Sequence, residues 1–261
     1  MDGNQQEGME MTKESQSTDT RQELPEMSFM DHLTELRKRL FYSILAIVLT
    51  GVACFIYAKE MIDFLIHPAL MLNPPIHLQV LKVQGMFIVQ VLVAFVGGLI
   101  LSIPVLVYQI WAFVKPGLYR KERKWVGLLI VITFFCFIVG SAMAYYLMLP
   151  LALRFFMNIS QPYSVSPIIA IDYYIRFVVM LMLSVGVVFE LPVLSFILAK
   201  MGVLHAGFMK KTRKYALIVI FILAAILTPP DPFTQMLMAV PLIIVYEISI
   251  TIVRLSEKSS S

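Results

Sequence analysis

Residues 83–114 run for 32 positions without a single charged side chain. A helix needs about 20 apolar residues to cross roughly 30 Å of membrane hydrocarbon. Because 32 residues are too few for two such helices, this run predicts one long transmembrane helix that is tilted or kinked at Pro104. Of the whole chain, 59% is hydrophobic, against about 45–50% in soluble domains. The chain is therefore predicted to be an all-α, polytopic membrane protein.

Five further apolar segments bring the predicted number of transmembrane helices to six. The six segments are Leu40–Ala58, Val83–Val114, Trp125–Leu153, Phe177–Ala199, Tyr215–Thr228 and Phe233–Val253. The fifth has only 14 residues, which reach about 21 Å as a helix. Either neighbouring helices shield this short helix, or it thins the bilayer locally, or flanking residues complete the crossing.

The distribution of basic residues predicts the orientation in the membrane. Six helices place both termini on the same side. Of the 21 Lys and Arg residues, 17 fall on that side, and only Lys59, Lys82, Arg154 and Arg176 fall on the other. Cytoplasmic segments carry the excess of Lys and Arg, so both termini are predicted to be cytoplasmic. The stretch WAFVKPGLYRKERK, residues 111–124, then belongs to a cytoplasmic loop.

The segments outside the helices suggest three parts. Residues 1–27 hold seven acidic residues against Lys13 and Arg21, which predicts a disordered acidic tail. Residues 28–255 form the membrane domain, and residues 256–261 a short cytoplasmic tail. Just before the first helix, apolar residues recur at helical spacing and predict an amphipathic cytoplasmic helix. These residues are Phe29, Leu33, Leu36 and Leu40.

Two carboxylates in basic surroundings are candidate binding residues. Glu122 lies among five Lys and Arg side chains in residues 115–124. It either neutralises its neighbours, as exposed pairs do, or recognises a guanidinium group in a planar, bidentate geometry. Glu35 either pairs with Arg39 one turn later or faces a cationic ligand.

Two other acidic residues, Glu190 and Glu247, fall inside predicted transmembrane helices. An ionisable group there costs about 2.5–3.5 kcal/mol and usually faces the bundle interior or a wet cavity. Alternatively, a protonated Glu190 could satisfy the carbonyl of Val188, which loses its partner to Pro192.

The turn LTPPDPFTQ, residues 227–235, separates the last two predicted helices. Pro229-Pro230 ends the fifth helix, and Asp231 is predicted to cap the sixth, where its charge complements the helix dipole. Thr228 and Gln235 are polar residues at the ends of apolar helices, which is typical of helix–helix contacts.

Motifs for catalysis are missing from the chain. No GxxxxGK[ST] loop for nucleotide phosphates is present, and no serine or cysteine stands in a nucleophile motif. The four histidines show no metal-ligand spacing. We therefore expect no enzyme activity, no metal and no cofactor, and any work must draw on a partner or on the membrane potential.

Several motifs together resemble one family, TatC, the signal-receptor subunit of the twin-arginine protein translocase. The resemblance covers about residues 28–255. Its motifs are HLTELRKRL, YQIWAFVKPGLYRKE, FELP, LTPPDPFTQ and the Tyr-Glu pair of the last predicted helix. It implies six transmembrane helices in a cupped bundle in the bacterial inner membrane, with both termini cytoplasmic.

The resemblance also implies a function. TatC-like proteins bind signal peptides that carry an Arg-Arg pair. With single-span partners similar to TatA and TatB, in a larger complex with further copies of the chain, they export folded proteins by the proton-motive force. On the matching positions, the residues that bind the signal peptide would be Glu122, Glu35, Phe113 and Pro104. Glu190 would be the polar residue of the concave face.

By the same resemblance, Thr228, Asp231 and Gln235 would mark the surface that docks the partner helices. Residues 59–82 and 154–176 would form a cap facing the periplasm.

Two other classes of membrane protein remain as alternatives. A proton-coupled transporter of small solutes would use Glu190 and Glu247 as its proton sites. An insertase-like assembly factor would need a positive charge inside the membrane, and the predicted transmembrane helices contain no Lys or Arg.

Overall fold

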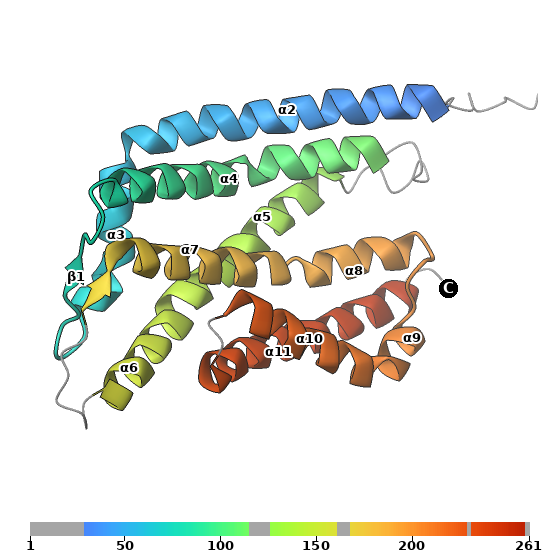
Figure 1. The fold of residues 1–261 in the computed structure, drawn as a ribbon. Coiled ribbons are helices and arrows are strands. Elements are labelled where there is room, and N and C mark those ends of the chain that lie inside the picture. Colours follow the sequence, from blue (N-terminus) through green and yellow to red (C-terminus); the bar gives the residue numbers. More distant parts are fainter. Residues whose placement is uncertain (1–28, 115–125, 161–167, 229–230, 259–261) are drawn as a thin grey trace, which may run out of the picture. The chain divides into compact units, whose positions relative to one another are not determined.

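The computed structural model describes residues 29–114, 126–160, 168–228 and 231–258. Apart from two strands of two residues each, the regular secondary structure of this part of the chain is helical (Figure 1). The elements are α2 (Phe29–Ile56), α3 (Ala58–Leu70), β1 (Leu78–Gln79), α4 (Gly85–Val114), α5 (Val126–Met143), the π-helical segment η3 (Ala144–Met148), α6 (Leu149–Ser160), β2 (Ile169–Ala170), α7 (Ile171–Val188), α8 (Leu191–Lys200), α9 (Ala206–Lys211), α10 (Arg213–Leu227) and α11 (Pro232–Lys258). The all-α prediction is therefore confirmed for the described residues.

The chain divides into two compact units, Met1–Lys38 and Arg39–Ser261. The structure describes the first unit from Phe29 onward, as the beginning of α2. No glycine or proline occurs between Phe29 and Thr50, so nothing in the sequence interrupts the helix. The segment predicted to be an amphipathic helix and the first predicted transmembrane helix are therefore one continuous helix. The amphipathic role of its first turns stays a prediction.

Five helical stretches of the described residues are long and apolar enough to cross a membrane. They are Leu33–Ile56, Gly85–Phe113, Gly127–Ser160, Ile171–Lys200 and Pro232–Glu257. The fifth segment predicted from the sequence is α10, which has 15 residues and reaches about 22 Å. Five of the six predicted helices are thus confirmed as apolar helices of membrane-spanning length, and the count of six stays a prediction.

Three of these helical stretches extend well beyond a predicted bound. The first begins at Leu33 rather than Leu40, the third continues past Arg154 to Ser160, and the fourth begins at Ile171 rather than Phe177. Charged side chains at a helix end can reach the polar membrane interface, so a charge does not by itself end the helix. The fourth stretch is also divided into α7 and α8 at Phe189 and Glu190. Pro192, in the first turn of α8, is the sequence signal for that break.

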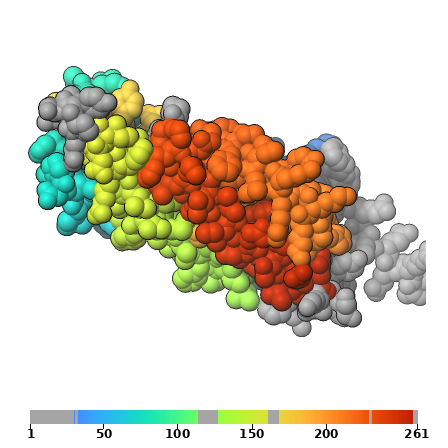
Figure 2. All heavy atoms as spheres, turned by 90° about the horizontal axis from the view of Figure 1, so that it is seen from below, coloured from blue at the N-terminus to red at the C-terminus, as the bar shows by residue number. Residues whose placement is uncertain are grey.

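Within the second unit, each long helix packs on one or more of the others. Helix α8 packs on α11, α7 packs on both α4 and α5, and α10 packs on α11 (Figure 1). The main core is apolar, and its most buried residues include Val93, Met148, Ile175 and Leu242. Figure 2 shows one face, on which α6 lies beside α11. There Phe155 of α6 stacks on Phe233 of α11, with ring centroids 3.8 Å apart.

Helix α2 meets α4 at a pair of glycines. The hydroxyl of Thr50 donates a hydrogen bond to the carbonyl oxygen of Gly98 at 2.7 Å, and Gly51 lies directly against Gly98. Nearer the start of α2, Arg39 Nη1 donates to Gln109 Oε1 of α4 at 3.2 Å. Small residues at such a crossing let two helix backbones approach closely, as in membrane helix pairs.

At one end of the helices, α3, α6, β1 and β2 form a structure that we call the cap. The two strands pair in parallel, Leu78 with Ile169 and Gln79 with Ala170. Lys82 Nζ lies 3.7 Å from Asp172 Oδ2 and joins the same two regions of the chain. The pairing therefore connects the segment before α4 to the start of α7.

Two buried tyrosines tie α3 to η3 and α7. Pro68 lies inside α3 and lacks the N–H that would bond the Phe64 carbonyl one turn earlier. The Tyr145 hydroxyl of η3 donates to that carbonyl at 2.6 Å, and the Tyr174 hydroxyl of α7 donates to the Leu65 carbonyl at 3.0 Å. Tertiary hydrogen bonds thus replace what the proline removes.

We expect Tyr145→Phe to lower the free energy of unfolding by about 1–3 kcal/mol, because the Phe64 carbonyl would lose its donor in an apolar surrounding. The matched control is Tyr146→Phe, since Tyr146 is 70% exposed. Thermal unfolding in detergent, followed by circular dichroism, measures both variants. Equal melting temperatures for the two would show that the Tyr145 hydroxyl contributes nothing to stability.

Candidate functional site

The end of α4 carries two of the predicted peptide-binding residues, Phe113 and Pro104. Both are partly exposed. They are nine residues apart, which is two and a half helical turns, so an α-helix directs their side chains to opposite faces. Helix α4 therefore does not bring these two side chains together. Trp111, which lies between them, is buried against Leu129 of α5 and Val193 of α8 and fixes this end of α4.

Of the two candidate carboxylates, the structure describes Glu35 but not Glu122. Glu122 lies outside the described residues. Glu35 is a partly exposed side chain of α2, one turn before Arg39. Arg39 donates one of its guanidinium N–H groups to Gln109 of α4.

Glu190 lies at the junction of α7 and α8. Its backbone N–H donates to the Val187 carbonyl at 3.1 Å, and its carbonyl accepts from the Leu194 N–H at 2.9 Å. The side-chain atom Oε1 is buried and has no hydrogen-bond partner among the described residues. No hydrogen bond joins the carboxyl group to the Val188 carbonyl in this part of the chain, so the alternative suggested by Pro192 finds no support.

The surroundings of Glu190 come mainly from α5. Thr133 and Cys136 of that helix lie beside its carboxyl group, and Thr133 is buried. A buried carboxyl oxygen without a partner is unfavourable for folding. The stability of the fold therefore does not explain why a carboxyl group lies in this apolar helix.

Glu247, the other acidic residue of the predicted transmembrane helices, forms an ion pair. Its Oε2 lies 2.7 Å from Arg213 Nη2 in an ion pair between α11 and α10, and both side chains are about half exposed, at 45% and 48%. The stretch Pro232–Glu257 includes this residue, and its role as an intramembrane polar site stays a prediction. The pairing could not be predicted from the sequence, because Arg213 lies 34 positions before Glu247.

The turn between α10 and α11 confirms the predicted helix cap. Asp231 Oδ1 accepts from the Thr234 N–H at 2.7 Å, and Oδ2 accepts from the Thr234 hydroxyl. The Thr228 hydroxyl donates to the Ala224 carbonyl at 2.8 Å and is buried. Gln235 Nε2 donates to the Phe221 carbonyl at 3.0 Å, which ties α11 to α10.

Next to Gln235, α10 presents an apolar surface. A shallow groove of about 350 Å³ runs along it. Its apolar residues are Leu217, Ile218, Phe221, Ile222 and Ala225. Because no described helix covers this face, it suits lipid or another apolar helix.

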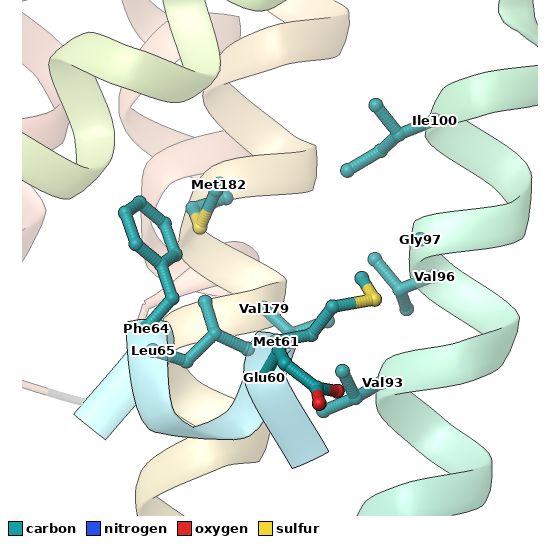
Figure 3. A pocket seen from close by; sticks show the side chains of 10 residues that line it. All are labelled: Glu60, Met61, Phe64, Leu65, Val93, Val96, Gly97, Ile100, Val179 and Met182. Atoms are coloured by element: carbon teal, nitrogen blue, oxygen red, sulfur yellow. The ribbon is translucent and has the colours of Figure 1, made fainter. Parts of the chain in front are cut away.

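An apolar cavity of about 310 Å³ lies between α3, α4 and α7. Figure 3 shows Val93, Val96 and Ile100 on the α4 wall and Met182 on the α7 wall. The carboxyl group of Glu60 is the charged group among the lining residues. The sequence alone did not predict this cavity, because it depends on the packing of α7 against α3 and α4.

Comparison with known proteins agrees with the motifs. The family model described as "Sec-independent protein translocase protein (TatC)" matches residues 31–241. The chain is 37% identical over 248 residues to Sec-independent protein translocase protein TatCy of Bacillus subtilis (strain 168), covering 93% of this chain and 96% of that protein. It is 34% identical over 233 residues to the TatC protein of Aquifex aeolicus (strain VF5), covering 89% and 97%.

Solved structures agree as well. A crystal structure of the twin arginine translocase receptor TatC superimposes with a TM-score of 0.79 at 35% identity, covering 87% of this chain and 99% of that chain. The family model and the long, high-identity matches confirm the resemblance that the motifs indicated. The chain therefore belongs to the TatC family and is a multi-pass membrane component of the Sec-independent, twin-arginine protein translocase.

Proposed function

We propose that this chain is the receptor subunit of the translocase and binds signal peptides that carry an Arg-Arg pair. Its six transmembrane helices lie in the bacterial inner membrane with both termini in the cytoplasm. Glu122 and Glu35 contact the arginine pair at the cytoplasmic face. With partners similar to TatA and TatB, and with further copies of itself, it exports folded proteins by the proton-motive force.

The observation that carries this proposal is the single carboxylate in the family's basic motif, YQIWAFVKPGLYRKE. A peptide with two arginines approaches a generally cationic membrane face and needs a local anionic site there. A carboxylate binds guanidinium through two parallel hydrogen bonds, which lysine cannot make. Glu122 therefore selects arginine over lysine, while Phe113 at the end of α4 adds an apolar contact.

The signal peptide also carries an apolar segment, which needs a place in the membrane. The cavity between α3, α4 and α7 supports a position along α4 and α7, because its lining is almost entirely apolar (Figure 3). Glu190, at the end of α7, supplies a polar contact further along the same helix. Pro104 acts through the backbone of α4, where it removes one helical hydrogen bond.

The partner helices dock on α10 and the start of α11. The apolar face of α10 beside Gln235 supports this position, and Thr228 and Asp231 hold the turn that joins the two helices. The alternative of a proton-coupled transporter would need Glu247 as a proton site, and the ion pair of Glu247 with Arg213 favours the receptor over it.

The test is the affinity of the purified protein for a fluorescent Arg-Arg signal peptide. We expect Glu122→Ala to weaken binding by about ten- to a hundredfold, since a charged hydrogen-bonded pair contributes about 1.5–3 kcal/mol. An Arg-Arg to Lys-Lys change in the peptide should cost a similar factor. The two changes together should cost little more than either alone, because they remove the same contact.

The matched control is Glu26→Ala, which removes the same charge from the N-terminal segment. It should leave the affinity unchanged. If both peptides bind both proteins, the unchanged protein and Glu122→Ala, with the same affinity, Glu122 is only a solvated loop charge.

A further inference from the structure

A second groove, of about 600 Å³, opens in the cap between α3 and α6. We call it the cap groove. Asp63 and His67 line it from α3, Arg154 and Pro150 from α6, and Tyr146 from η3. Figure 2 shows α3 and α6 side by side at one end of the molecule, in agreement with their packing contacts.

The cap groove brings charges of both signs together. Asp63 and His67 are four residues apart on α3 and therefore share one face of that helix. Arg154 faces them from α6. None of these three side chains forms a hydrogen bond or an ion pair with another residue in the ranges that the structure describes. By contrast, Asp172 and Glu247 each have a cationic partner.

Apolar side chains flank these charges. Phe64, Met71 and Leu72 line the same groove, and Met71 is 71% exposed. The groove lies where two membrane-spanning stretches end, since α6 completes the stretch Gly127–Ser160 and α3 follows Leu33–Ile56. Charged and aromatic groups next to an exposed apolar surface are typical of the level of the lipid headgroups.

We propose that the cap groove binds the headgroup of one phospholipid that carries both a phosphate and an ammonium group. Arg154 contacts the phosphate through its planar fork, and His67 adds a ring N–H donor. The carboxylate of Asp63 contacts the ammonium group. The acyl chains follow the apolar surface beside Phe64 and Met71. This proposal is independent of signal-peptide binding.

A zwitterionic lipid fits better than an anionic one for an electrostatic reason. Asp63 would repel a headgroup that is only negative, whereas it attracts an ammonium group. Arg154 alone would retain either lipid. Asp63 is therefore the residue that distinguishes between them.

The test uses the purified full chain in detergent with phosphatidylethanolamine or phosphatidylglycerol of the same acyl chains. Native mass spectrometry counts the lipids retained per protein. We expect one phosphatidylethanolamine to be retained in preference to phosphatidylglycerol. Arg154→Gln should reduce its retention about tenfold, as for the loss of a charged hydrogen bond. The matched control Arg176→Gln changes an exposed arginine of α7 that does not line the groove, and it should have no effect.

A second variant keeps the proposal testable if Arg154→Gln does not fold. Asp63→Asn should lower the retention of phosphatidylethanolamine, raise that of phosphatidylglycerol and so remove the preference. Equal retention of both lipids by the unchanged protein, or equal effects of Arg154→Gln and Arg176→Gln, would overturn the proposal. The purified chain could also form a dimer that Arg154→Gln disrupts without changing the bound lipid. That result would overturn the proposal and assign the groove to a second copy of the chain.

Discussion

Gly98→Ala is expected to lower the free energy of unfolding by about 3 kcal/mol or more and to loosen α2 from α4. A Cβ atom on Gly98 would lie 2.5 Å from both the Cα and the N of Gly51. Those are backbone atoms of α2, which cannot rotate aside as a side chain can. The helices must separate, and the hydrogen bond from Thr50 to the Gly98 carbonyl would then be strained or lost.

The effect is large because α2 has few other attachments in the second unit. Among residues 39–56, only Cys54 is buried. Its sulfur lies close to Gly97, next to the same crossing. A disturbance at Gly98 therefore acts on the main packing contact between residues 39–56 and α4.

The matched control is Gly51→Ala, on the other side of the same crossing. A Cβ on Gly51 would meet only the Ala94 carbonyl oxygen, at 3.8 Å, which is an ordinary contact. Alanine is favoured over glycine in a helix by about 1 kcal/mol, so this variant should be neutral or slightly stabilised. Unfolding in detergent measures both variants, and similar stabilities for the two would contradict the close crossing.

The long helices could be predicted from the sequence, because a helix that crosses the membrane needs a long run of residues without charge. Runs without charge, such as residues 83–114, identify α4 almost to the residue. The ends of the helices were less certain, because Arg154 and Asp172 lie within helical stretches although they are charged. The π-helical segment at Ala144–Met148 could not be predicted, since it depends on the packing of Tyr145 and Met148 in the core.

Sites made by a few neighbouring residues were also predictable. Asp231 and Thr234 are three residues apart, and the cap that they form follows from local helix geometry. Glu190 was identified because a carboxyl group inside an apolar run is costly. The cap groove was not predicted, because Asp63 and Arg154 are 91 positions apart in the sequence. Only tertiary packing brings such residues into one groove.

Glu190→Leu is expected to lower the rate of export by about tenfold or more. It is not expected to lower the stability of the fold. The Glu190 Oε1 atom is buried and has no hydrogen-bond partner among the described residues. Replacing this carboxyl group by an apolar side chain of similar size removes a desolvation cost of about 1–3 kcal/mol. The free energy of unfolding should therefore stay the same or increase.

The loss of export follows from the proposed role of Glu190 as a polar contact for the inserted signal peptide. Glu190→Gln separates charge from hydrogen bonding, because the amide keeps a donor and an acceptor but carries no charge. If hydrogen bonding is what the peptide needs, Glu190→Gln should export at nearly the original rate while Glu190→Leu does not. Export of a folded reporter protein from cells, together with unfolding of the purified variants, measures both properties. A Glu190→Leu protein that exports normally but unfolds more easily would show that Glu190 serves the fold and not the substrate.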